Sequence, residues 1–180
     1  ISKFTLLLKL KLMEENLKPR SVNHSRTTLS ELTIPSYANF GGKVHGGTIL
    51  SMMDKIAYVC ATKHAGNYCV TASIDAVDFL SAVDVGDQVT LYASVNYTGS
   101  SSLVVGIKVV SENIKIGTVR HTNTSYFTMV AMTEDHKSTK VPALQLETKE
   151  DVRRFLEAKK RKELKKTTQK NHQAMKLQID

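Results

Sequence analysis

The spacing of apolar side chains predicts one long helix that begins near residue 46. From Gly46 to about Lys63, apolar residues recur three and four positions apart, which is the spacing of an amphipathic helix. At about 100° per residue they fill one half of the helical wheel, so we expect other structure to cover most of this helix. The residues of the apolar face are Ile49, Leu50, Met52, Met53, Ile56, Ala57, Val59 and Cys60. Gly66 and Asn67 are typical of a helix end.

After this helix the chain changes to the two-residue alternation of β-strands. From Val70 to Ala76 apolar residues alternate with Thr71, Ser73 and Asp75, which predicts that these three side chains share one face of a strand. Similar patterns, rich in Thr, Val and aromatic residues, predict four more strands, over 26–34, 89–97, 103–110 and 118–132. Because short connections join the last four strands, we expect them to pair as an antiparallel meander.

The order of these elements favours a single α+β domain. A curved antiparallel sheet wrapped around one central helix buries the apolar faces of both. The chain of 180 residues is 41% hydrophobic, which suits one such domain and is too short for two ordinary ones. We expect a partly disordered N-terminal extension over 1–24, the domain over 25–146, and a basic C-terminal helix and tail over 147–180, with its helix over 149–170.

Charge and cysteine content narrow the classes of protein. The net charge is +8, and residues 150–180 carry much of it, with ten Lys or Arg against five acids. No apolar run reaches the roughly 18 residues of a membrane span. Two cysteines cannot build a disulfide framework, and no Cys-x-x-Cys pair indicates a zinc site. We therefore expect a cytoplasmic protein without a membrane span or a metal centre.

The segment from Asn39 to Asp54 holds the most unusual residues of the chain. Two glycine pairs flank His45 directly before the predicted helix. Glycine lets main-chain N–H groups at a helix N-terminus approach a carbonyl or phosphate oxygen, although a tight turn into the helix explains the same pattern. Asp54 lies just beyond the edge of the apolar face, where a carboxylate is paired, at the surface or functional.

Gly46 and Asp54 of one helix cannot act on the same reaction centre. Eight residues separate them, which corresponds to about 12 Å of helix rise. If both act, a second copy of the chain must supply one of them. The spacing therefore predicts a dimer with shared sites.

These residues resemble the helix-entry motif of hotdog-fold acyl-CoA thioesterases. The best match is the branch of the cytosolic (brain-type) acyl-CoA hydrolases and their bacterial relatives. His45 with an aspartate nine residues later, an asparagine six residues earlier and Val85-Gly-Asp87 after the next strand form the most specific part of the match. The similarity also includes 70–79, 126–130, 141–144 and the charged tail, and it runs from about Ser25 to Lys166.

The resemblance implies that the protein hydrolyses an acyl-CoA thioester to a free fatty acid and CoA. It implies a homodimer with shared active sites, assembled into a hexamer as a trimer of dimers. Asp54 matches the family's carboxylate, which acts as general base on water or as nucleophile. Asn39 matches the asparagine that holds the water or carbonyl in the facing half-site, and His45 matches the motif histidine. Gly46 or Gly47 matches the backbone donor that polarises the thioester carbonyl.

The resemblance identifies the residues that bind the CoA part of the substrate less directly. Ser73 aligns with a polar residue that supports the carboxylate in some relatives, but Thr71 and Asp75 share its predicted face, so this role stays open among them. CoA carries phosphates, which Lys, Arg and N–H groups bind. The candidates for substrate and CoA binding are Thr71, Ser73, Lys43, Ser100, Ser101 and Arg120. No cofactor is implied, because CoA is part of the substrate.

Two other classes of function compete with this interpretation. Another hotdog acyl-thioester enzyme, such as a dehydratase, normally needs a histidine with a Glu or Asp in a different helical context, and no such pair lies near His45. A non-catalytic module could bind acyl-CoA, or bind nucleic acid through 153–166. Interspersed acids and the lack of a recognised nucleic-acid motif beside this tail argue against a nucleic-acid partner.

Overall fold

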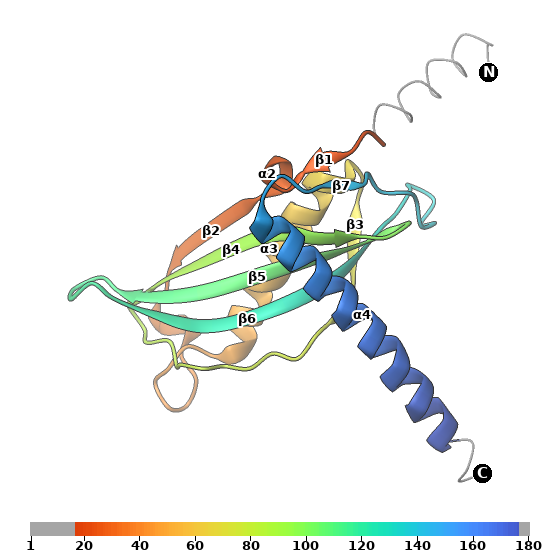
Figure 1. The fold of residues 1–180 in the computed structure, drawn as a ribbon. Helices are drawn as coiled ribbons and strands as arrows, with labels where there is room; N and C mark the ends of the chain where they lie inside the picture. Colours follow the sequence, from red (N-terminus) through yellow and green to blue (C-terminus); the bar gives the residue numbers. More distant parts are fainter. Residues whose placement is uncertain (1–16, 177–180) are drawn as a thin grey trace, which may run out of the picture.

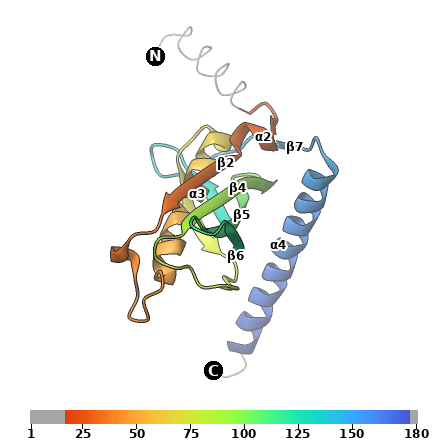
Figure 2. The same ribbon diagram turned by 90° about the vertical axis from the view of Figure 1, so that its left-hand side faces the viewer.

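The computed structural model describes residues 17–176 and forms a curved antiparallel sheet with one long helix on each face (Figure 1). Helix α3 (Gly46–Ala65) packs on the inner face and helix α4 (Lys149–Lys176) crosses the outer face, as the side view in Figure 2 shows. The predicted α+β hotdog fold, with its central helix and charged C-terminal helix, is confirmed. In spatial order the strands are β2 (Thr27–Leu32), β4 (Gln88–Thr98), β5 (Ser102–Asn113), β6 (Thr118–Ala131) and β3 (Cys69–Ile74).

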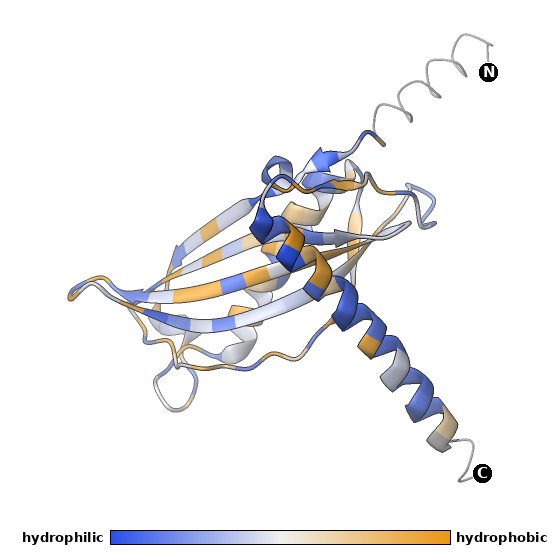
Figure 3. Cartoon of the chain, viewed as in Figure 1, coloured by the Kyte–Doolittle hydropathy of each residue, from blue (hydrophilic) through white to orange (hydrophobic). Residues whose placement is uncertain are grey.

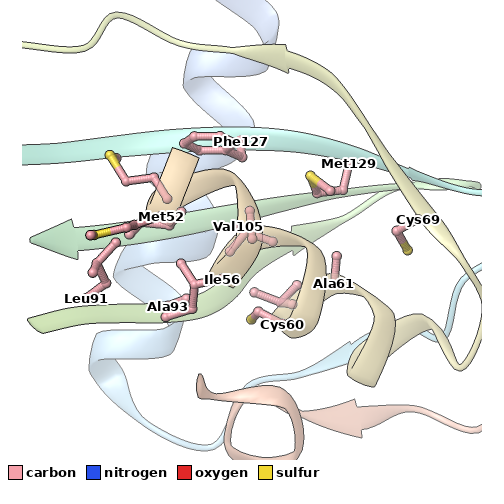
Figure 4. Close-up of a cluster of buried hydrophobic side chains, with 14 of the residues drawn as sticks. Met52, Ile56, Cys60, Ala61, Cys69, Leu91, Ala93, Val105, Phe127 and Met129 are labelled. Carbon is pink, nitrogen blue, oxygen red and sulfur yellow. The ribbon is translucent and has the colours of Figure 1, made fainter. Parts of the chain in front are cut away.

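Helix α3 begins where the glycine pattern predicts and ends two residues beyond the predicted end. Its apolar face meets alternate residues of three central strands, among them Leu91, Val105 and Phe127 (Figure 4). Val59, expected on the covered face, is 39% exposed. The sheet of one chain covers only one side of α3, so the predicted apolar face is too wide at this edge.

The pairing of the strands differs from the predicted meander. Strands β4, β5 and β6 follow one another as expected, but β3 pairs with β6 and not with β4. A long connection over 75–87 separates β3 from β4 and runs past the end of the sheet, partly along β6, where Leu80 N–H donates to the carbonyl oxygen of Thr122. Hairpins require shorter loops, so β3 becomes an edge strand.

A β-bulge in β3 breaks the predicted alternation. Thr71 pairs with Met129 whereas Ser73 pairs with Thr128, which leaves Ala72 as the extra residue. A bulge of this kind changes the face to which the following side chains point. Thr71 therefore contacts the side of the sheet that holds α3, and Ser73 contacts α4 on the other side. The prediction that the two share a face is wrong.

Short elements at the two ends of the domain lie side by side. Strand β1 (Arg20–Ser21) pairs in parallel with β7 (Leu144–Gln145). Helix α2 (Val22–Ser25) follows β1 and buries Val22. The expected domain boundary after residue 24 falls inside α2, and most of the expected N-terminal extension, residues 1–16, lies outside the described residues.

Helix α4 lies across the outer face of the sheet at an angle to the strands. It begins with a capping box in which Asp151 N–H donates to Thr148 Oγ1 and Thr148 N–H donates to Asp151 Oδ2. Its surface is mostly hydrophilic (Figure 3). Phe155 packs against Tyr97 of β4 with ring centroids 5.1 Å apart. In the described part of the chain, neither α4 nor any other helix has the length and apolar character of a membrane span.

Candidate active site

A tight loop leads the chain into α3. After the 3-10 turn η1 (Pro35–Tyr37), a bridge between Ala38 and Val44 closes the loop. Asn39 Oδ1 accepts hydrogen bonds from the N–H groups of Gly41 (2.9 Å) and Lys43 (3.2 Å). The amide of Asn39 is therefore fixed through its oxygen. Its Nδ2 group makes no hydrogen bond to the described residues and can donate to another molecule.

The first turn of α3 leaves one N–H group open. His45 caps the helix, because its Nδ1 accepts a hydrogen bond from Gly47 N–H at 2.9 Å. The N–H groups of Thr48 and Ile49 donate to the carbonyl oxygen of His45. Among the described residues no acceptor meets the N–H of Gly46. Of the two glycines expected as donors, Gly46 therefore offers the available one, at the positive end of the helix dipole.

Phe79 packs directly against Gly46. A Cβ atom on Gly46 would lie 3.3 Å from the Phe79 ring, closer than nearly all ordinary contacts. Phe79 belongs to the connection over 75–87 and is 46% exposed. Its place in the sequence predicts no role for it, although Phe79 ends the segment over 70–79 that resembles the acyl-CoA thioesterases. The structure thus places an aromatic wall beside the open N–H group.

Asp54 lies two turns further along α3, on its exposed side. Its Oδ1 accepts a hydrogen bond of 2.6 Å from Thr71 Oγ1 on β3. Its Oδ2 accepts no hydrogen bond from the described residues. The carboxylate is therefore held in place by one oxygen while the other can accept a proton. Of the two expected polar partners, the structure brings Thr71 to Asp54 and directs Ser73 away.

The surface around Asp54 continues along an unpaired strand edge. β3 is the last strand of the sheet, so its outer edge presents main-chain donors and acceptors without a neighbouring strand. Tyr58, one turn after Asp54, packs against Tyr68 with ring centroids 5.9 Å apart, and both rings are largely exposed. Ile74, at the far end of β3, is 42% exposed. This surface combines a free edge with apolar side chains.

Two cations expected to bind CoA are paired with carboxylates. Lys43 Nζ contacts Asp84 Oδ1, and Arg120 Nη2 donates to Asp84 Oδ2 (3.0 Å) and Asp87 Oδ2 (2.7 Å). The hydrogen bonds from Lys43 and then Arg120 lower the pKa of Asp84. These contacts hold the turn at Gly86 against the start of α3. The structure therefore gives Lys43 and Arg120 a partner other than phosphate.

The remaining candidates lie away from the start of α3. Ser73 Oγ accepts a hydrogen bond of 2.9 Å from Lys165 on the outer face of the sheet. The carbonyl oxygens of Ser100 and Ser101 accept hydrogen bonds from Val141 and Ala131, at the end of the sheet where α3 ends. One chain therefore does not bring these three serines to Gly46. In the described residues no three His, Cys, Asp or Glu side chains gather into a cluster that could hold a metal ion.

Comparison with known proteins identifies relatives across most of the chain. Residues 41–118 match the family model described as the thioesterase superfamily. Protein VdlD of Helicobacter pylori is 43% identical over 145 residues, which cover 81% of this chain and 83% of VdlD. The cytosolic acyl coenzyme A thioester hydrolase of Homo sapiens is 30% identical over 148 residues, which cover 81% of this chain and 39% of that longer protein.

Solved structures agree with these relatives. An apo-hexameric acyl-CoA thioesterase superposes with a TM-score of 0.81 at 39% identity, covering 84% of this chain and 97% of its own. A second structure is the acyl-CoA hydrolase of Staphylococcus aureus in complex with butyryl coenzyme A, coenzyme A and coenzyme A disulfide. It superposes with a TM-score of 0.79 at 29% identity, covering 89% of this chain and 99% of its own. Other structures of that enzyme carry an alanine in place of an aspartate, an asparagine or a threonine. The chain therefore belongs to the thioesterase superfamily, in the branch of the hotdog-fold acyl-CoA thioester hydrolases.

Proposed function

We propose that this protein hydrolyses an acyl-CoA thioester to a fatty acid and CoA at a site shared by two copies of the chain. The observation that carries the proposal is the separation of two reactive groups on α3. The open N–H of Gly46 and the carboxylate of Asp54 lie eight residues apart, or about 12 Å along one helix. A single reacting carbonyl group cannot contact both, so the second group comes from another copy.

The free edge of β3 supplies the surface for that second copy. Antiparallel pairing of two β3 edges would satisfy the unpaired main-chain groups and cover Tyr58, Tyr68 and Ile74. It would also bring Asp54, which is held by β3 through Thr71, next to the partner. The hexameric relatives support a further assembly of three such dimers. The name of the human relative supports a cytoplasmic location.

Hydrolysis then divides between the two halves of the site. Gly46 N–H donates to the thioester carbonyl oxygen and stabilises the negative charge that develops there. Asp54 of the partner subunit takes a proton from the water that attacks the carbonyl carbon. Alternatively, it attacks that carbon itself and forms an anhydride, which water then hydrolyses to the free fatty acid. Asn39 Nδ2 donates to the water or the carbonyl. Breaking of the C–S bond releases CoA as thiol after protonation of its sulfur.

Residue spacing in the Staphylococcus aureus enzyme supports these roles. In its alanine variants the substituted asparagine precedes the substituted aspartate by 15 residues, and the substituted threonine follows it by 17. Asn39, Asp54 and Thr71 have the same spacing here. The three residues that were chosen for substitution in that enzyme thus correspond to the three polar side chains of this proposed site.

Mixing two inactive variants tests the shared site. Asp54→Asn removes the carboxylate, and Gly46→Pro removes the N–H at a first helical position, where the helix backbone tolerates proline. The Phe79 ring, 3.3 Å from the added Cβ, must shift slightly to make room. Each variant alone should lose thiol release from an acyl-CoA. Co-expressed in equal amounts, they should regain about a quarter of the wild-type activity, because half of the dimers would contain one intact site of two.

The controls separate misfolding from the shared-site geometry. Each variant is measured for thermal unfolding and dimer size before it is assayed. Two folded, dimeric variants that stay inactive when co-expressed would show that Gly46 and Asp54 do not meet across an interface. Wild-type turnover by Asp54→Asn alone would exclude the carboxylate from the reaction.

A further inference from the structure

A groove between α4 and the outer face of the sheet gathers positive charge. It has a volume of about 210 Å³ and lies on the opposite side of the sheet from α3. Four cations of α4 line it, against a single carboxylate, that of Asp75, and the hydroxyls of Ser73 and Thr128. The four cations are Arg161, Lys162, Lys165 and Lys166.

Arg161 has hydrogen-bond donors that nothing in the described chain accepts. Its guanidinium group stacks on the ring of Tyr126 at 3.4 Å from the ring centroid. Its Nε and Nη2 atoms are buried and make no hydrogen bond. Among the described residues its one ion pair is with Glu157, whose Oε2 lies 3.9 Å from Nη1. A buried donor without an acceptor is costly, so a small movement of the Arg161 side chain that lets these atoms donate to an anion in the groove would be favourable.

Lysine side chains next to Arg161 leave the charge unbalanced. Lys162 Nζ lies 4.9 Å from the ring centroid of Tyr97 and donates a hydrogen bond of 3.4 Å to Ser102 Oγ. Burial and the charge of Lys166 lower the pKa of Lys162. Of the three lysines that line the groove, Lys165 is the one that pairs with a carboxylate among the described residues, at 2.9 Å from Asp75 Oδ1. The groove thus holds neighbouring cations in a partly desolvated place.

We propose that this groove binds a phosphate group of an organic ligand, with Arg161, Lys162 and Lys166 as its donors. Phosphate oxygens accept charge-assisted hydrogen bonds from guanidinium and ammonium groups. Whole ligands typically occupy about 300–1,000 Å³, so a cavity of this size suits a phosphate or diphosphate while the rest of the molecule lies outside. The phosphate belongs either to the acyl-CoA substrate or to a separate nucleotide.

Calorimetric titration tests the site without any turnover. Inorganic pyrophosphate, CoA and ADP are titrated into the full chain and into the double variant Lys162→Gln with Lys166→Gln. Loss of two charge-assisted contacts should weaken pyrophosphate binding about tenfold or more. The matched control replaces Lys159 and Lys160, two exposed cations of α4 outside the groove, by glutamine. It should change the affinity less than about twofold.

Measurements of KM, kcat and ADP binding then identify which ligand carries the phosphate. If it belongs to acyl-CoA, the double variant should raise KM with little change in kcat. If it belongs to a nucleotide, KM should stay constant while ADP binding is lost. The proposal is overturned if the folded wild type binds none of the three probes, or if the control weakens binding as much as the double variant does. Because the titration needs no hydrolysis, either result leaves the proposed activity to be judged separately.

Discussion

The two ends of α3 satisfy their main-chain groups in opposite ways. At the C-terminal end, Arg20 Nη1 donates to the carbonyl oxygens of Lys63 (3.0 Å) and His64 (2.8 Å). Gly66, with a φ of 68°, closes the last turn by donating to the carbonyl oxygen of Thr62. At the N-terminal end, by contrast, the N–H of Gly46 meets no acceptor among the described residues. The first arrangement stabilises the fold, and the second keeps a donor available for a ligand.

A buried histidine strengthens the contrast. His64 is fully buried near the closed end, with Nδ1 3.3 Å from Ser25 Oγ and Nε2 3.4 Å from the carbonyl oxygen of Pro142. His45, at the open end, is exposed and caps the helix with its ring. One helix thus uses the same residue type for packing at one end and for shaping a candidate site at the other. Substitutions at the two ends should therefore affect different measurements.

The largest effect is expected from Asp54→Asn on the exposed side. Loss of a general base typically lowers kcat by about 10³-fold, or roughly 4 kcal/mol. Asp54 is exposed, so the midpoint of thermal unfolding should change little. Lys55→Gln, the adjacent exposed residue, should keep both kcat and the unfolding midpoint. A stopped thiol-release assay on both variants measures the difference, and equal activity in the two would contradict the role of Asp54.

His64, at the C-terminal end of α3, should make the free energy of unfolding depend on pH. Burial lowers the pKa of His64 from 6.5 to about 4. As the pH falls, the unfolded chain therefore binds this proton before the folded chain does. Above about pH 6.5 His64 is neutral in both states and does not make the free energy of unfolding depend on pH. Between there and pH 4, this free energy should fall by about 3 kcal/mol. Urea unfolding at several pH values measures this fall. In the variant His64→Gln, the slope of the free energy of unfolding against pH should be lost between pH 4 and 6.5. An unchanged slope in the variant would assign it to other groups.

Arg20→Ala should destabilise the fold without changing catalysis. It removes a charged donor from two carbonyl oxygens at the negative end of α3. We expect a loss of about 2 kcal/mol in the free energy of unfolding. The value of kcat at 25 °C should stay at the wild-type level, since the open end is untouched. A matching loss of kcat in protein that is still folded would mean that the two ends are coupled.

Thr71→Ala should give the smallest effect and the finest test of how Asp54 is held. It removes the hydrogen bond of 2.6 Å to Asp54 Oδ1. We expect kcat to fall about tenfold, equivalent to about 1.4 kcal/mol. Thr71→Ser keeps the hydroxyl and should restore most of the activity. If serine fails to restore it, the threonine methyl group and not the hydrogen bond is responsible.

Much of this fold follows from local patterns in the sequence. The spacing of apolar residues predicts α3 and most strand bounds within a few residues, because these elements are set by their own burial pattern. The pairing of β3 with β6 could not be predicted in this way. It depends on the path of the connection over 75–87, which carries no periodic pattern.

The candidate site shows the same division. The glycines, His45 and Asp54 stand out through their position around one predicted helix. The ion pairs of Lys43 and Arg120 with Asp84 could not be predicted, because Asp84 is distant in sequence from both. The bulge that separates Thr71 from Ser73 leaves no mark in the alternation of residue types. Phe79 reaches Gly46 only through a loop, and no local rule predicts such a contact.

The extra residue in β3 has a consequence for how this edge strand can change. Thr71 positions a carboxylate on one side, and Ser73 with Asp75 anchors Lys165 on the other. Shifting the register of β3 by one residue would break the contacts on both faces at once, so the contacts on one face cannot change without those on the other. Insertions and deletions between residues 71 and 75 should therefore be tolerated far less than substitutions there.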